Sequence, residues 1–191
     1  MRLSTKNIIF AFGLITFAVV TKLWLIDYAN VETLTSSSIL AGALLGPYLG
    51  LLVGLAAVVG KDMVIGNTTI LVYTWSAWAI IGASSAWLQR FSSRSSITDR
   101  SIRFTGWSIV TTLFFYGWTN FGVWHIGGLY PHTWAGLLDC YVLAVPFLRN
   151  QLLGNLMIVP VVSVVTLTVY QYLPYVKRGL ASAFVKVWLW K

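Results

Sequence analysis

The residues best able to do chemistry in this chain of 191 residues lie between positions 120 and 155. The stretch holds two histidines, two tryptophans, one aspartate, one cysteine and the pair Arg149 and Asn150, within sequence that is otherwise apolar. Polar and charged side chains that interrupt an apolar run are costly in lipid, so each needs a partner or a function. We therefore take 120–155 as the candidate functional segment.

Arg149 follows an apolar Pro-Phe-Leu sequence, so its guanidinium needs a carboxylate, backbone carbonyls or an anionic ligand. The candidate carboxylates are Asp139, Asp62 and Glu32. Two interpretations stay open: Arg149 forms an ion pair that locks a helix break at 149–150, or it contacts a ligand. Asp62 follows Lys61, and this pair either marks a helix end or reaches across a cavity.

Asn120, Trp124, His125 and His132 flank a Gly-Gly turn and could line a cavity that opens outward. Trp124 and Tyr130 are typical of an interfacial aromatic belt, but in a cavity the same rings would stack on a flat heterocycle. The two histidines are seven residues apart, and no third ligand has a recognisable spacing. We predict no metal.

Nucleophilic catalysis would need a serine or cysteine beside a histidine base. Cys140 and the serines at 36–38 are available, but no Gly-x-Ser-x-Gly elbow accompanies them. No Gly-Lys-Ser/Thr loop for nucleotide phosphates occurs either. We predict that the chain is not an enzyme and holds no cofactor, so that any energy from ATP would come from another subunit.

The composition is that of a membrane protein. Hydrophobic residues make up 58% of the chain and charged residues 9%, and the mean hydropathy is +0.78. Several apolar runs have the roughly 17–25 residues that a helix needs to cross a bilayer. The net charge of +8 is scattered over the ends of these runs, which favours anionic lipid headgroups as partners and argues against nucleic acid.

The apolar runs predict an all-α bundle of six transmembrane helices over 1–175, followed by a basic amphipathic tail at 176–191. The Gly46-Pro47 turn signal separates the second helix from the third. We expect 91–103 to be a hydrophilic loop, and 133–147 to be part of a long broken helix or an interfacial segment. The predicted helices are about 8–26, 35–45, 48–65, 69–88, 104–124 and 152–173.

The distribution of basic residues predicts the orientation, since cytoplasmic segments retain positive charge. With six crossings, ten of the thirteen basic residues fall on the side of the two termini, and four of the five acids fall on the other side. Both termini are therefore expected in the cytoplasm, in a multi-pass protein of the cell membrane. The polar segments at 27–38, 61–68 and 120–150 then gather near the outer face.

The motifs NFGVW, YPHT, GLLDCY and PFLRNQLLGN, in this order, resemble a family of uncharacterised membrane proteins related to the substrate-binding S components of energy-coupling-factor (ECF) transporters. The earlier LLGPYLGLLVGLAAVVGKDMVIGN is similar to the second-to-third helix segment of S components. The two segments differ from the pattern at Asn155 and at Lys61. The positions that match are Asn120, Trp124, Tyr130, Pro131, Cys140, Tyr141, Arg149, Asn150 and Gly154.

The resemblance implies a vitamin-uptake subunit that holds a small solute near the outer face and docks on a transmembrane coupling protein driven by two ATPases. The first helix lacks the alanine pair that several S components use for docking. Glycines that recur every fourth residue form one smooth helical face and are the substitute candidates. These are Gly42, Gly46, Gly50 and Gly54. A structural or assembly protein of the membrane, in which the polar segment is a packing device, is the alternative.

Overall fold

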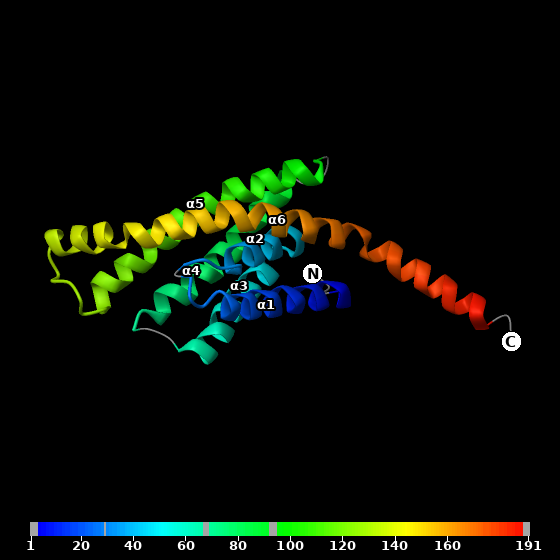
Figure 1. The fold of residues 1–191 in the computed structure, drawn as a ribbon, viewed down its shortest axis with the longest axis horizontal. Coiled ribbons are helices and arrows are strands. Elements are labelled where there is room, and N and C mark those ends of the chain that lie inside the picture. The colour runs from blue at the N-terminus through cyan, green and yellow to red at the C-terminus, as the bar shows by residue number, and fades with distance from the viewer. Residues whose placement is uncertain (1–3, 29, 67–68, 92–94, 189–191) are drawn as a thin grey trace.

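The computed structural model describes residues 4–28, 30–66, 69–91 and 95–188, with side chains up to residue 171. Within these ranges the regular structure is helical and contains no strand (Figure 1). The elements are α1 (Thr5–Trp24), α2 (Leu34–Leu45), α3 (Pro47–Ile65), α4 (Leu71–Ser84), the 3-10 helix η1 (Ser85–Phe91), α5 (Ile97–Ile126) and α6 (Trp134–Trp188).

The separation of α2 from α3 follows from two neighbouring residues and confirms the predicted boundary. Gly46 has a φ of 95°, a conformation that only glycine adopts without strain, and so ends α2. Pro47 then occupies the first turn of α3, where its missing N–H needs no partner.

Helix α5 begins earlier than predicted, so the expected loop at 91–103 is wrong for its second half. The Ser96 hydroxyl accepts from the Asp99 N–H at 3.1 Å, and the Asp99 carboxylate accepts from the Ser96 N–H at 3.2 Å. This reciprocal capping box satisfies two amide groups that a helix start otherwise leaves open. The polar residues up to Arg103 therefore form helix.

Helix α6 is continuous over 55 residues, and the predicted break at 149–150 is wrong. The segments 133–147 and 152–173 belong to this one helix, although Pro146 and Pro160 lie inside it. The carbonyl of Pro160 accepts from the Ser101 hydroxyl of α5 at 3.1 Å, which helps to hold the helix on its neighbour. Along the predicted tail the backbone continues α6 to Trp188, while the tail's side chains lie outside the described residues.

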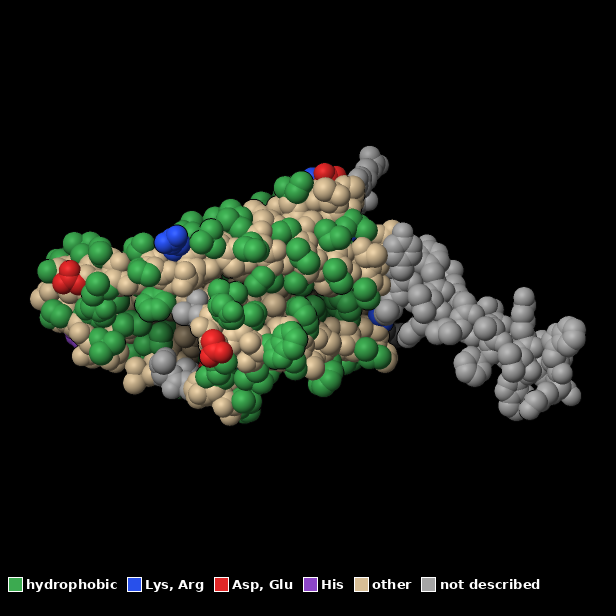
Figure 2. Space-filling view, in the orientation of Figure 1, with side chains coloured by type: hydrophobic (Ala, Val, Ile, Leu, Met, Phe, Trp, Pro, Cys, Tyr) green, Lys and Arg blue, Asp and Glu red, His purple; other side chains and the backbone are tan. Residues whose placement is uncertain are grey.

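Among the residues that the structure describes, three helical segments are long and apolar enough to cross a membrane, namely Thr5–Trp24, Pro47–Ile65 and Trp134–Gln171. Figure 2 shows hydrophobic side chains spread over most of the visible face, with scattered charged ones between them. A soluble fold would cover such a surface with polar groups. These observations agree with the prediction of an all-α membrane protein.

The centre of the bundle is α2, where every residue from Leu34 to Leu45 except Leu44 is buried. Glycines allow its neighbours to approach at backbone distance. Gly42 and Gly50 lie against the carbonyl of Gly82 in α4, and Gly54 lies against the carbonyl of Trp78. The face predicted for docking another subunit is thus occupied by α4 of the same chain.

The connections α1–α2, α3–α4 and α5–α6 lie at one end of the bundle, and the two termini lie at the other (Figure 1). The three polar segments singled out in the sequence therefore come together at the end away from the termini.

Candidate solute-binding cavity

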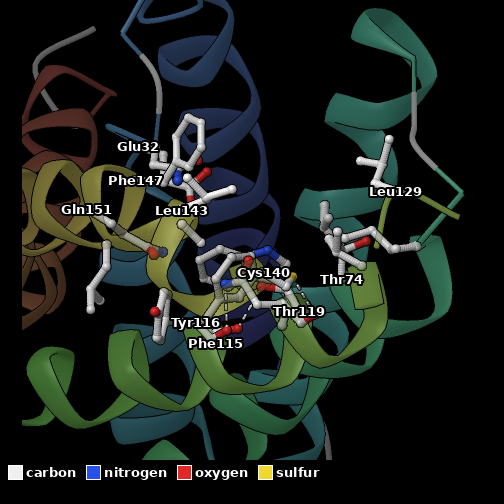
Figure 3. Close-up of a pocket in the computed structure, with 18 of the residues that line it drawn as sticks. Glu32, Thr74, Phe115, Tyr116, Thr119, Leu129, Cys140, Leu143, Phe147 and Gln151 are labelled. Carbon is white, nitrogen blue, oxygen red and sulfur yellow. Dashed lines mark hydrogen bonds between the residues drawn. The ribbon is translucent and has the colours of Figure 1, made fainter. Parts of the chain in front are cut away.

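A cavity of about 540 Å³ lies at this end, between the α1–α2 connection, the facing ends of α3 and α4, and helices α5 and α6. Its volume falls within the roughly 300–1,000 Å³ typical of small-molecule sites. In Figure 3, Glu32, Phe147 and Gln151 lie on one side of the cavity, and Thr74 and Leu129 lie on the opposite side.

The apolar part of the wall combines aromatic and aliphatic side chains. Trp78 is fully buried in the bundle, and its ring centroid lies 5.0 Å from that of Phe115. Phe147 and Leu143 of α6 face the cavity as well. Flat rings of this kind pack against a planar solute at little entropic cost.

Several polar groups of the wall are already paired with backbone. Tyr116 donates to the carbonyl of Tyr141 at 2.6 Å, Thr119 donates to that of Phe115 at 2.7 Å, and the Asn120 amide nitrogen donates to that of Tyr116 at 2.8 Å. The last bond leaves the side-chain oxygen of Asn120 as its acceptor for a ligand.

Charged groups line the same cavity. Glu32, in the α1–α2 connection, is 7% exposed, and burial raises the pKa of its carboxyl, which the positive charges of Lys22 and Lys61 partly offset. Lys61 forms an ion pair with Asp62, whose other oxygen accepts from the Trp75 indole at 2.8 Å. Both carboxylate oxygens of Asp62 thus have partners, and Asp62 does not line the cavity, whereas Glu32 does.

A sequence model described as a family of unknown function, DUF6580, matches residues 2–178. The chain belongs to the DUF6580 family. No curated protein matches the chain, and no solved structure does.

In this DUF6580 protein, the cavity includes three of the predicted substrate-binding residues, Glu32, Asn120 and Tyr130. Asp62 does not line the cavity itself but forms an ion pair with Lys61, which does. Tyr141 donates to the carbonyl of Gly117 at 2.7 Å and so fastens α6 to α5.

Trp124 and the two histidines lie around the α5–α6 turn of the DUF6580 protein. The Trp124 indole donates to the carbonyl of Pro131 at 3.0 Å, and its ring lies 5.3 Å from that of His132. His125 is hydrogen-bonded through Nδ1 to the Tyr73 hydroxyl at 2.6 Å. Their observed contacts hold the turn and join α4 to α5. Among the described residues, no group of three His, Cys, Asp or Glu side chains is placed to hold a metal ion.

The remaining predicted residues, Asp139, Arg149 and Asn150, are exposed on α6 and do not line the cavity. Asn150 instead lines a separate surface pocket with Asp27. Within the part of the chain that the structure describes, Lys61–Asp62 is the one ion pair, so the ion pair that was one of the two interpretations of Arg149 is not formed.

The sequence interpretation missed Gln151, Tyr116 and Thr119 of the DUF6580 cavity. The buried face of α6 follows a helical spacing of three and four residues. Its members in this part of the helix are the buried Cys140, Ala144, Gln151 and Asn155 and the half-buried Leu148. Treating 134–171 as one helix would have identified this face. Arg149 follows Leu148 by one residue and so points about 100° away from it around the helix axis.

Proposed function

We propose that this DUF6580 protein is a polytopic membrane protein that binds a small solute in the cavity. In this proposal α1–α6 supply six crossings of the cell membrane, and both termini are cytoplasmic. The cavity then opens toward the outside, because it lies at the end away from the termini. The excess of basic residues on the side of the termini supports this orientation.

The observation that carries the proposal is the presence of Glu32 and Gln151 in the wall of a mainly apolar cavity that also contains aromatic rings. Gln151 is 3% exposed and Glu32 is 7% exposed, and both line this space. Burying a carboxylate and an amide is costly unless they gain hydrogen bonds. A ligand with N–H donors would supply such bonds.

The solute class follows from this wall. Trp78, Phe115 and Phe147 suit a planar ring, and the Glu32 carboxylate and the Asn120 side-chain oxygen suit donors on its edge. We therefore propose a flat, polar heterocycle with exposed N–H groups, a description that fits vitamin-like micronutrients.

The transport part of the proposal rests on the sequence resemblance of 120–155 to S-component relatives. In that scheme a transmembrane coupling protein with two ATPases supplies the energy for uptake. The Gly42, Gly50 and Gly54 face is packed against α4, so docking would use another surface of the protein.

Mass spectrometry of small molecules released from purified protein tests the proposal. We expect the wild type to release a planar solute, and the Gln151→Leu variant, which keeps the side-chain volume but loses the amide, to release much less. Asn150→Leu is the matched control, because Asn150 is adjacent but exposed outside the cavity. A Glu32→Gln variant should weaken rebinding roughly tenfold or more, as expected on losing a charged hydrogen-bond partner.

Equal solute retention by Gln151→Leu and Asn150→Leu would contradict the assignment of the cavity. Release of no small molecule by the folded wild type, together with a stable protein partner that copurifies, would favour the assembly role instead.

A further inference from the structure

A second concave surface lies between α1 and α6, away from the solute cavity. It is an apolar groove of about 670 Å³ whose walls are exposed side chains of the two helices. Ile9 and Phe17 of α1 stand on one side, and Val161, Val165 and Val169 of α6 stand on the other. We call it the α1–α6 groove.

One end of the α1–α6 groove has an aromatic pair beside it and carries a positive charge. Phe10 and Tyr170 pack edge to face with ring centroids 5.0 Å apart, which joins the two helices there. The Lys6 ammonium lies 4.0 Å from the centroid of the Tyr170 ring and also lines the groove. The groove is therefore apolar along its length and cationic at one end.

Its length matches one leaflet of a bilayer. Lys6 and Phe17 are eleven residues apart on α1 and so about 16 Å apart along the helix. Half of the hydrocarbon core is about 15 Å thick. An acyl chain that follows α1 would thus place its headgroup beside Lys6.

We propose that the α1–α6 groove binds an anionic phospholipid, with an acyl chain between the two helices and the phosphate at Lys6. The Lys6 end lies on the side of the termini, where basic residues are concentrated and where anionic lipids enrich a cytoplasmic leaflet. The lipid would fill the space that α1 and α6 leave between them. This proposal rests on the membrane orientation proposed above but does not depend on solute binding.

Two substitutions separate the headgroup contact from the chain contact. Lys6→Ala removes the cation, and we expect the preference for phosphatidylglycerol over phosphatidylcholine to fall roughly fivefold. Gly13→Phe puts a ring into the groove at a position where an added Cβ meets nothing within 4 Å, so it should reduce the retention of both lipids.

The measurement is native mass spectrometry of full-length protein taken from vesicles that contain the two lipids with identical acyl chains. Arg90→Ala and Gly106→Phe are matched controls, since Arg90 is exposed toward the same end and Gly106 has open space on α5. Both controls should keep the wild-type lipid pattern, and thermal unfolding verifies that every variant is folded.

The proposal is overturned if Lys6→Ala keeps the wild-type lipid preference, or if Gly13→Phe retains as much lipid as Gly106→Phe. It is also overturned if the wild type binds both lipids equally, or if a copurifying protein, rather than lipid, is lost on Gly13→Phe.

Discussion

Replacing Gly82 with alanine tests the packing at the centre of the bundle. A Cβ at this position would overlap the carbonyl of Gly50 and come within 3.2 Å of the Leu51 nitrogen, so the obstacle is backbone and cannot rotate away. Overpacking of this kind costs about 1–3 kcal/mol. Alanine recovers up to about 1 kcal/mol through its better helix propensity. Because both close contacts are with backbone, we take the cost in the upper part of this range, about 2–3 kcal/mol, and expect a net loss of about 1–2 kcal/mol.

For a chain of this size such a loss lowers the midpoint of thermal unfolding by about 2–8 °C. The ten tryptophans provide a fluorescence signal for unfolding in detergent. Gly106→Ala is the matched control, because a Cβ there meets nothing within 4 Å and only the propensity gain remains. If Gly82→Ala unfolds at the same temperature as Gly106→Ala, α3 and α4 do not meet at backbone distance and the description of the core fails.

Two further predictions concern helix α5. Asn155 of α6 donates to the Thr112 hydroxyl at 2.8 Å in a buried position, so Asn155→Ala should cost about 1–3 kcal/mol in unfolding experiments, whereas Asn150→Ala on the exposed face should cost little. At the start of α5, hydrogen bonds from Ser96 lower the pKa of Asp99 below its usual 3.8. The stabilising contribution of the Asp99 carboxylate is therefore present above pH 3.8 and lost as the pH falls through the lowered pKa. The unfolding midpoints of the wild type and Asp99→Asn should therefore converge in acid. A constant difference between the two midpoints down to the lowest pH would contradict this.

Local sequence signals were sufficient to predict a helix boundary where one or two residues determine the backbone conformation. Gly46 and Pro47 separate α2 from α3 because one adopts a positive φ and the other tolerates only a helix start. The start of α5 was missed although Ser96 and Asp99 have the spacing of a capping box. The segment is polar, and hydrophilic sequence was interpreted as loop.

The break predicted in α6 shows where local sequence signals are not sufficient. Arg149, together with Pro146, was taken as an interruption, yet a proline removes one hydrogen bond and neighbouring helices can compensate for it in a membrane bundle. Whether a helix continues through such a site depends on the packing around it. The sequence pattern therefore located a segment that contributes to the cavity wall but not the face of that segment that points inward.

The continuity of α6 explains why Gln151 faces the cavity and Arg149 does not. Both are polar residues in the same apolar run, and chemistry alone favours the arginine as a ligand contact. A step of two residues on a helix turns the side chain by about 200°, which separates the exposed Arg149 from the buried Gln151. Only the continuity of α6 decides which of them faces the cavity.

The packing of α3 against α4 supports one wall of the solute cavity. Toward the termini, Gly50 and Gly82 bring the two backbones into contact. One turn from Gly82 toward the start of α4, the carbonyl of Trp78 contacts Gly54, and the Trp78 side chain lines the cavity. One turn further toward the start of α4, Thr74 also lines the cavity. The glycine contacts thus fix α4 against α3 next to the cavity wall, so Gly82→Ala should reduce solute retention together with stability. Gln151→Leu should reduce retention alone, and this contrast separates the support of the cavity from the groups that contact the solute.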